Sequence, residues 1–132
     1  MVDIKKMKKI INTNNAPAPI GPYSQAVIAG NFVFLSGQIP INPQSGELVM
    51  DDIKTETKQV MENIKSILYE AGIDFSHIVK TSIFLTDMQN FAQVNEVYGT
   101  YFTGQFPARE TVAVAGLPKN VNVEISVTAI KP

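Results

Sequence analysis

Arg109 is the side chain whose type most clearly suggests chemistry, because it is the only arginine among the 11 basic residues of the sequence. It follows Phe106-Pro107-Ala108, where a rigid proline turn leads into a predicted strand. The planar guanidinium of an arginine fits a carboxylate with two parallel hydrogen bonds, which the point charge of a lysine cannot reproduce. Arg109 is therefore a candidate anchor for an acidic ligand. A structural salt bridge is the plainer explanation, and the residue pattern alone leaves both open.

Glu124 is the second candidate, because it is a charged residue on the polar side of an alternating strand. The apolar residues at odd positions of this strand form one face, and Glu124 points to the opposite face beside Asn122 and Ser126. If that second face meets another subunit, the carboxylate lies in a cleft and can hold or polarise a water molecule. The alternative is a solvated glutamate paired with Lys119. The apolar face consists of Val121, Val123, Ile125, Val127 and Ala129.

Several classes of site are excluded by composition. The sequence has no cysteine, which removes disulfides, thiolate nucleophiles, iron–sulfur clusters and cysteine zinc sites. Its single histidine, His77, cannot build a histidine-rich metal cage within one chain. His77 follows Asp74-Phe75-Ser76 without a G-x-S-x-G elbow, so we interpret this cluster as a turn rather than as a hydrolase triad. We therefore expect no metal site.

The length and net charge of the chain limit its domain count and its classes of binding partner. A chain of 132 residues predicts one domain, with residues 1–8 as a flexible, lysine-rich extension. The formal charge of −1 provides no broad basic face, so we expect no nucleic-acid binding. The apolar runs are shorter than the roughly 20 residues that span a bilayer, and no secretory signal is recognisable. We therefore expect a cytoplasmic protein that does not bind membranes.

Periodicity predicts the elements that position these residues. The pair Gly30-Asn31 joins two apolar runs as a hairpin, and a helical stripe fills residues 52–71, with Asp51 or Asp52 as cap and Gly72 at its end. A second helix is expected to open at Asn90, with Gln93 completing a capping box, and to stop before Gly104 and Pro107. The strands are predicted at residues 8–12, 26–29, 32–35, 77–86, 110–115 and 121–130.

The order β-β-β-α-β-α-β-β predicts an α+β fold, in which two helices cover one face of a six-stranded mixed sheet. The hairpin strands do not alternate between apolar and polar residues, which is typical of strands buried on both faces. Two helices cover only one face of such a sheet. We therefore expect partner subunits to cover the other face in a closed homo-oligomer.

The sequence resembles the RidA (YjgF-like) family of reactive-intermediate deaminases from about Lys9 onward. The resemblance is carried by five segments in the family's order, which makes it highly specific: APAPIGPYSQAV (16–27), FLSGQIPINPQSGELV (34–49), VKTSIFLTDM (79–88), FAQVNEVYGTYF (91–102) and FPARETVAVAGLPKNVNVEI (106–125). It implies a chorismate-mutase-like fold and a homotrimer with three clefts between subunits. The implied reaction is cofactor-independent hydrolysis of 2-imino and 2-enamino acids, such as 2-aminoacrylate, to 2-oxo acids and ammonia.

The resemblance also implies roles for individual residues. Arg109 matches the arginine that binds the substrate carboxylate, and Glu124 matches the acid that positions water. Tyr23, Ser36 and Asn95 match other residues of the cleft, with Tyr23 as a lid over the ligand. Thr111 matches a position whose backbone N–H helps to hold the substrate carboxylate. Tyr23, Ser36 and Asn95 each also have a plain structural interpretation.

Two positions depart from the family pattern. Glu110 stands where relatives usually carry a serine, and Ser126 replaces a residue that is commonly acidic. A carboxylate next to Arg109 would compete with substrate, but adjacent strand residues point to opposite faces, so we expect Glu110 to face away.

Two other functions share the same residues. A non-enzymatic module that senses 2-oxo acids would also need Arg109, but not water activation by Glu124. A ribonuclease or translation inhibitor is the second alternative, which the acidic balance disfavours.

Overall fold

A six-stranded mixed sheet forms the centre of the computed structural model, which describes residues 3–132. The strand order is β1-β2-β3-β6-β4-β5, and only β4 and β5 pair in parallel. The strands are β1 (Lys8–Ile11), β2 (Ala26–Ala29), β3 (Phe32–Leu35), β4 (Ile78–Leu85), β5 (Ala108–Ala113) and β6 (Val123–Ile130).

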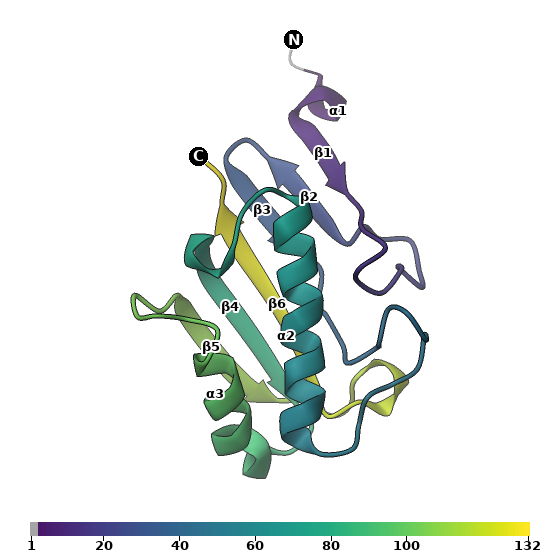
Figure 1. The fold of residues 1–132 in the computed structure, drawn as a ribbon. Helices are drawn as coiled ribbons and strands as arrows, with labels where there is room; N and C mark the ends of the chain where they lie inside the picture. Colours follow the sequence, from purple (N-terminus) through teal and green to yellow (C-terminus); the bar gives the residue numbers. More distant parts are fainter. Residues whose placement is uncertain (1–2) are drawn as a thin grey trace.

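The helices are α1 (Ile4–Met7), α2 (Ile53–Glu70) and α3 (Phe91–Gly99), and α2 and α3 lie on the same side of the sheet (Figure 1). Short 3₁₀ turns occupy Phe75–His77, Met88–Asn90 and Pro118–Asn120. The expected fold class and element order are confirmed, and α1 is the one helix that the sequence pattern did not predict. Within residues 3–132, no helix is long and apolar enough to cross a membrane.

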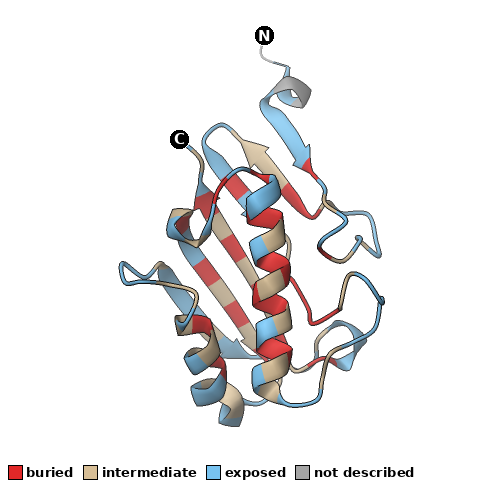
Figure 2. Cartoon of the chain, viewed as in Figure 1, coloured by how far each residue is buried: buried red, intermediate tan, exposed pale blue. Residues whose placement is uncertain are grey.

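The core lies between α2 and the sheet face that we call the helix side, defined by Val33, Ile83, Ile125 and Val127. The helix contributes a continuous buried stripe at helical spacing, visible as the red band along α2 in Figure 2. Burial alternates residue by residue along β6, as the sequence pattern predicts. The stripe of α2 includes Val60, Met61, Ile64, Ile67 and Leu68.

Local signals for turns and caps are confirmed at the hairpin and at α2. Gly30 has φ +60°, a conformation that glycine adopts without steric cost, and the flanking strands pair in the expected register. Asp52 caps α2 by accepting a hydrogen bond from the Thr55 backbone N–H at 2.7 Å. Gly72 has φ +80° directly beyond the helix.

The second helix opens at Asn90 as predicted, but the predicted capping box is absent and the helix ends earlier than expected. Asn90 has helical angles and makes no side-chain capping bond, because the 3₁₀ turn Met88–Asn90 runs directly into α3. Asp87 caps that turn instead, by accepting from the Gln89 N–H. The helix ends at Gly99, and the aromatic residues Tyr101 and Phe102 that follow it continue the apolar surface from a turn.

The opposite sheet face, which we call the open side, carries exposed apolar side chains. Phe32 and Phe34 are each 47% exposed and stack on one another with ring centroids 6.0 Å apart. Val112 and Ile130 add further exposed apolar surface on the same side. Exposed apolar side chains that gather on one face of a protein mark interaction surfaces.

A fully buried carboxylate joins α2 to the start of β6. Glu56, in the first turn of α2, is 0% exposed and accepts hydrogen bonds from the Asn122 N–H at 2.7 Å and the Val123 N–H at 3.2 Å. The Asn122 side-chain amide donates a third bond at 2.9 Å. This contact fixes the end of β6 that leads to Glu124.

Replacing Glu56 by glutamine is expected to lower the free energy of unfolding by about 2–4 kcal/mol, because an amide cannot accept all three bonds and leaves buried donors unpaired. Denaturant unfolding at fixed protein concentration measures the change. Glu70→Gln, at the exposed end of the same helix, is the control and should change the free energy by less than about 0.5 kcal/mol. Equal effects of the two substitutions would contradict this account of Glu56.

Candidate active site

Arg109 lies on the edge strand β5, with its side chain packed against α3. Its Nη1 donates a hydrogen bond to Asn95 Oδ1 at 2.7 Å. The guanidinium carbon lies 5.2 Å from the centroid of the Tyr98 ring and 5.7 Å from that of Phe91. Both distances lie within the range of cation–π attraction. The structure therefore brings together two expected site residues, Arg109 and Asn95.

The guanidinium borders an open hollow of about 460 Å³. Its walls combine the polar groups of Arg109 and Asn95 with the apolar surfaces of Tyr98, Phe106 and Pro107. An arginine has five N–H donors, so the bond to Asn95 leaves capacity for a two-bond grip on a carboxylate. The hollow beside Arg109 can therefore bind a small acid.

Glu124 lies on the open side of β6, where its carboxyl group covers the backbone of Gly37. A Cβ atom placed on Gly37 would lie 2.8 Å from the carboxyl carbon of Glu124, closer than such contacts occur. Gly37 does not have a positive φ, so its backbone alone would accept another residue. Partial burial raises the pKa of the Glu124 carboxyl above its ordinary value of 4.5.

Ser36 and Tyr23 lie near Gly37, and their contacts define a supporting structure. The Ser36 hydroxyl donates to the Ser24 carbonyl at 2.6 Å, which ties the end of β3 to the loop that carries Tyr23. Tyr23 is 49% exposed and lines a small hollow together with Gly37 and Gln38. An exposed aromatic ring at the rim of a hollow can act as a lid.

The same loop is held from inside by the buried side chain of Gln25. Its amide nitrogen donates to the carbonyls of Thr13 and Pro17, at 3.0 and 2.9 Å, and its oxygen accepts from the Thr13 N–H at 2.7 Å. These three bonds tie Gln25 to Thr13 and Pro17 at the start of the loop.

Thr111 lies two residues after Arg109 on the helix side of β5, beside Ile83. Its Oγ1 is buried and, among the described residues, has no hydrogen-bond partner. A buried hydroxyl without a partner is uncommon in folded proteins.

One chain does not bring Arg109 and Glu124 together. Arg109 shares the helix side with its β4 partner Thr81, whereas Glu124 shares the open side with its partner Phe84. The two Cα atoms are separated by two strand spacings and three residues along the strands, which corresponds to about 14 Å. A small ligand between the two side chains of one chain would have to pass through the sheet. The expected site is therefore present as two halves.

Glu110 faces away from Arg109, as expected from alternation along the strand. It lies on the open side, where its carboxylate pairs with Lys80 Nζ at 2.7 Å and accepts from the Ser82 hydroxyl. The hydrogen bond from Lys80 lowers the pKa of the Glu110 carboxyl, with Ser82 contributing. Glu110 therefore does not compete for the guanidinium within its own chain.

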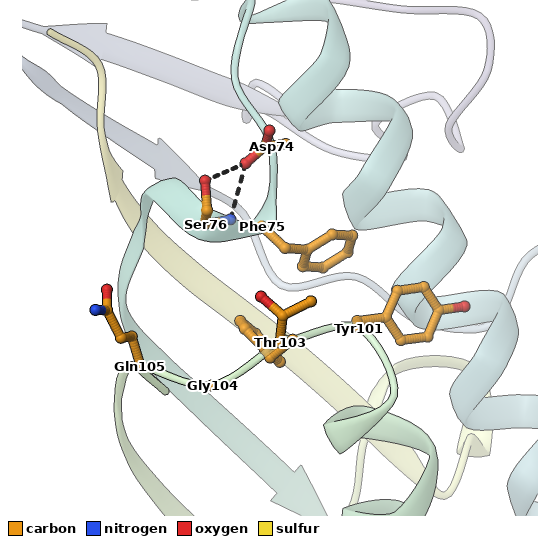
Figure 3. Close-up of a pocket in the computed structure, with 8 residues that line it drawn as sticks. Asp74, Phe75, Ser76, Tyr101, Thr103, Gly104 and Gln105 are labelled. Carbon is orange, nitrogen blue, oxygen red and sulfur yellow. Dashed lines mark hydrogen bonds between the residues drawn. The ribbon is translucent and has the colours of Figure 1, made fainter.

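A second hollow, of about 490 Å³, lies at the turn that contains His77 (Figure 3). Asp74 accepts there from the Ser76 backbone N–H at 2.9 Å, while the Asp74 N–H donates to His77 Nδ1 at 3.2 Å. These bonds form a capping box, so the polar groups of this cluster serve the turn. The interpretation of His77 as a turn residue is confirmed.

Sequence reasoning missed three residues that shape the two halves: Phe91, Tyr98 and Gly37. A usable signal existed for the first two, because Phe91, Asn95 and Tyr98 are spaced i, i+4, i+7 and so share one face of α3. Gly37 gave only a weak signal, its position next to Ser36. The need for a glycine there depends on Glu124, which is distant in sequence.

Comparisons with known proteins identify the family of the chain. The family described as endoribonuclease L-PSP matches residues 13–131. A RutC family protein of Pyrococcus horikoshii is 54% identical, with 95% of this chain and 99% of that protein covered. The 2-iminobutanoate/2-iminopropanoate deaminase of Mus musculus is 46% identical, with 95% and 93% covered.

The fold is also shared with solved structures. The crystal structure of E. coli TdcF with bound serine superimposes with a TM-score of 0.90 at 43% identity, with 94% of this chain and 99% of that one covered. A six-stranded mixed sheet with two helices is thus an architecture that this chain shares with solved structures. The chain belongs to the endoribonuclease L-PSP family, also called the RidA or YjgF family.

Replacing Gly37 by alanine is expected to push the Glu124 carboxylate away from the backbone and toward solvent, which lowers its pKa toward 4.5. Titration of the side-chain carboxyl carbon by NMR measures this pKa. Gly116→Ala is the matched control, because a Cβ there meets no atom within 4 Å and no positive φ is involved. An unchanged Glu124 pKa in Gly37→Ala would show that the carboxylate does not depend on the glycine.

Proposed function

We propose that this protein is a cofactor-independent deaminase that hydrolyses 2-imino acids and their 2-enamino tautomers, such as 2-aminoacrylate, to 2-oxo acids and ammonia. The observation that carries the proposal is the Arg109 guanidinium, held by Asn95 at the border of a hollow of about 460 Å³. Relatives that bear the deaminase name support it, as does serine, a small amino acid with a carboxylate, in the related TdcF structure.

The reaction needs little apparatus, because the carbon of a protonated imine is already electrophilic. Arg109 holds the carboxylate of the substrate and so fixes the position of the neighbouring C=N carbon. Glu124 accepts a proton from a water molecule whose oxygen forms a bond to that carbon. Glu124 returns this proton to the amino nitrogen of the adduct. The C–N bond then breaks, ammonia leaves with the electron pair of that bond, and the hydroxyl proton passes to Glu124 as the C=O bond of the 2-oxo acid forms.

The remaining cleft residues serve this geometry. Asn95 holds one edge of the guanidinium, and Tyr23 covers the ligand as a lid. Ser36 fixes the loop of Tyr23, and the Thr111 backbone N–H adds a donor for the substrate carboxylate.

Both halves of the site meet only if they come from different chains, because one sheet separates them. We therefore infer a homotrimer, in which the open side of each sheet is covered by neighbouring subunits and each of three clefts takes Arg109 from one chain and Glu124 from the next. The exposed pair Phe32 and Phe34 on the open side supports this arrangement. Such imines form in amino-acid metabolism, and we expect the protein to act in the cytoplasm.

Arg109→Lys is expected to lower kcat/KM for 2-iminopropanoate by about 100-fold while leaving the fold intact, because an ammonium keeps the charge but loses the two-bond grip. The assay generates 2-aminoacrylate in situ and times the release of pyruvate against a blank without enzyme. Lys119→Arg, at an exposed position, is a control. Activity equal to wild type in Arg109→Lys would remove Arg109 from the mechanism.

Glu124 must be ionised to accept a proton, so activity is expected to be complete above its pKa and to decline as the pH falls through it. Burial raises that pKa, so the midpoint should lie above 4.5. Glu124→Gln should lower kcat by about 100-fold and remove this acidic limb. Rates are corrected for spontaneous hydrolysis at each pH. An acidic limb that persists in Glu124→Gln belongs to another group. If the wild type binds 2-oxo acids but does not speed the release of pyruvate, the chain is a sensor.

Mixing the two inactive variants tests the shared cleft. Arg109→Ala and Glu124→Ala chains are co-refolded, so that hybrid trimers contain clefts with an intact Arg109 from one chain and an intact Glu124 from the other. Partial recovery of activity is expected, and light scattering should give three times the chain mass. A monomeric mass, or no recovery in verified hybrids, contradicts the shared cleft.

A further inference from the structure

Tyr98 makes contacts that the reaction itself does not explain. Its ring is 4% exposed and lies between Phe102, at a centroid distance of 4.9 Å, and the Arg109 guanidinium, at 5.2 Å. The ring therefore contacts both an aromatic side chain and the charged group that borders the hollow.

The hydroxyl of Tyr98 fixes this ring in place. It donates to Thr81 Oγ1 at 2.9 Å, and Thr81 is 0% exposed. Thr81 lies opposite Arg109 in the parallel pairing of β4 and β5. The hydrogen bond thus joins α3 to the sheet directly beside the residue whose side chain the ring supports. Burial raises the pKa of Tyr98, which keeps the hydroxyl protonated as a donor at neutral pH.

Three residues on one face of α3 lie beside the guanidinium. The guanidinium lies over the rings of Phe91 and Tyr98. Asn95, which stands between these two residues in the sequence, accepts a hydrogen bond from it. A free arginine side chain has many rotamers, and ordering it during binding weakens affinity. Contacts that order it beforehand remove this cost.

We propose that Tyr98 is a positioning residue for Arg109: its ring, fixed by Thr81, holds the guanidinium ready for a carboxylate. The effect of this positioning on catalysis rests on the proposed function. The ordering of Arg109 itself does not, because its contacts with Tyr98 are present in the protein without a ligand. It assigns to Tyr98 and Thr81 a role in ligand affinity, although Thr81 is buried in the core and touches no ligand.

Because Arg109 is the only arginine of the chain, its Nε–Hε group gives a single side-chain NMR signal that can be followed without assignment ambiguity. In the wild type, the rings of Tyr98 and Phe91 should shift this signal away from the position of an exposed arginine. Tyr98→Leu removes one ring and should move the signal toward that position. The dissociation constant of the Tyr98→Leu variant for pyruvate, measured by calorimetry, should be about fivefold higher than that of the wild type. KM should rise by a similar factor and kcat should change less.

Two milder variants keep the test open if Tyr98→Leu does not fold. Tyr98→Phe and Thr81→Val each remove the fixing hydrogen bond and keep the ring, so both should lower the order parameter of the Arg109 side chain by similar amounts. Tyr101→Phe is the matched control, because the Tyr101 hydroxyl donates to Glu62 Oε2 at 2.6 Å, away from Arg109. It should leave the Arg109 signal unchanged.

The outcomes separate this inference from the proposed function. An unchanged Arg109 signal in folded Tyr98→Leu, unchanged order in both milder variants, or an equal effect of Tyr101→Phe overturns the role of Tyr98. If the wild type hydrolyses no imine but the signal responds as expected, positioning stands and the deaminase proposal fails.

Discussion

Alternation along β-strands keeps Arg109 and Glu124 apart, and the rest of the site follows from that separation. Successive side chains point to opposite sheet faces, so Arg109 shares a side with Thr81, while Glu124 shares the other with Phe84. In the part of the chain that the structure describes, α2 and α3 lie on the same side of the sheet (Figure 1). Arg109 can therefore be packed and ordered within its own chain. Glu124 instead lies on the open side, where apolar side chains remain exposed.

Much of the fold was readable from the sequence because short-range signals agreed with the tertiary structure. The pair Gly30-Asn31 predicted the hairpin, and the stripe ending at Gly72 predicted α2. Both are local: a positive φ or a helical period can be recognised from neighbouring residues. The second helix was harder. The aromatic residues after Gly99 continue its apolar pattern although the backbone has already left the helix, so periodicity alone overestimated its length.

The site was readable as residue types but not as contacts. A lone arginine and a glutamate within an alternating strand could be singled out, and the family resemblance supplied Asn95. That Asn95 bonds to Arg109 depends on how α3 packs against β5, which no local pattern contains. The same holds for Gly37, whose missing Cβ matters only because Glu124, 87 positions later in the chain, lies over it. Long-range contacts of this kind need the coordinates.

The position of β6 has a consequence for how the molecule is made. This strand is the last of the six to leave the ribosome, yet it lies between β3 and β4 and so joins the two halves of the sheet. Until it emerges, β3 and β4 both present unpaired edges, and the stripe of α2 lacks Val123, Ile125 and Val127 as packing partners. The sheet can therefore close only after β6 has been synthesised, and a chain cut before β6 would expose two strand edges of the kind that other chains can pair with.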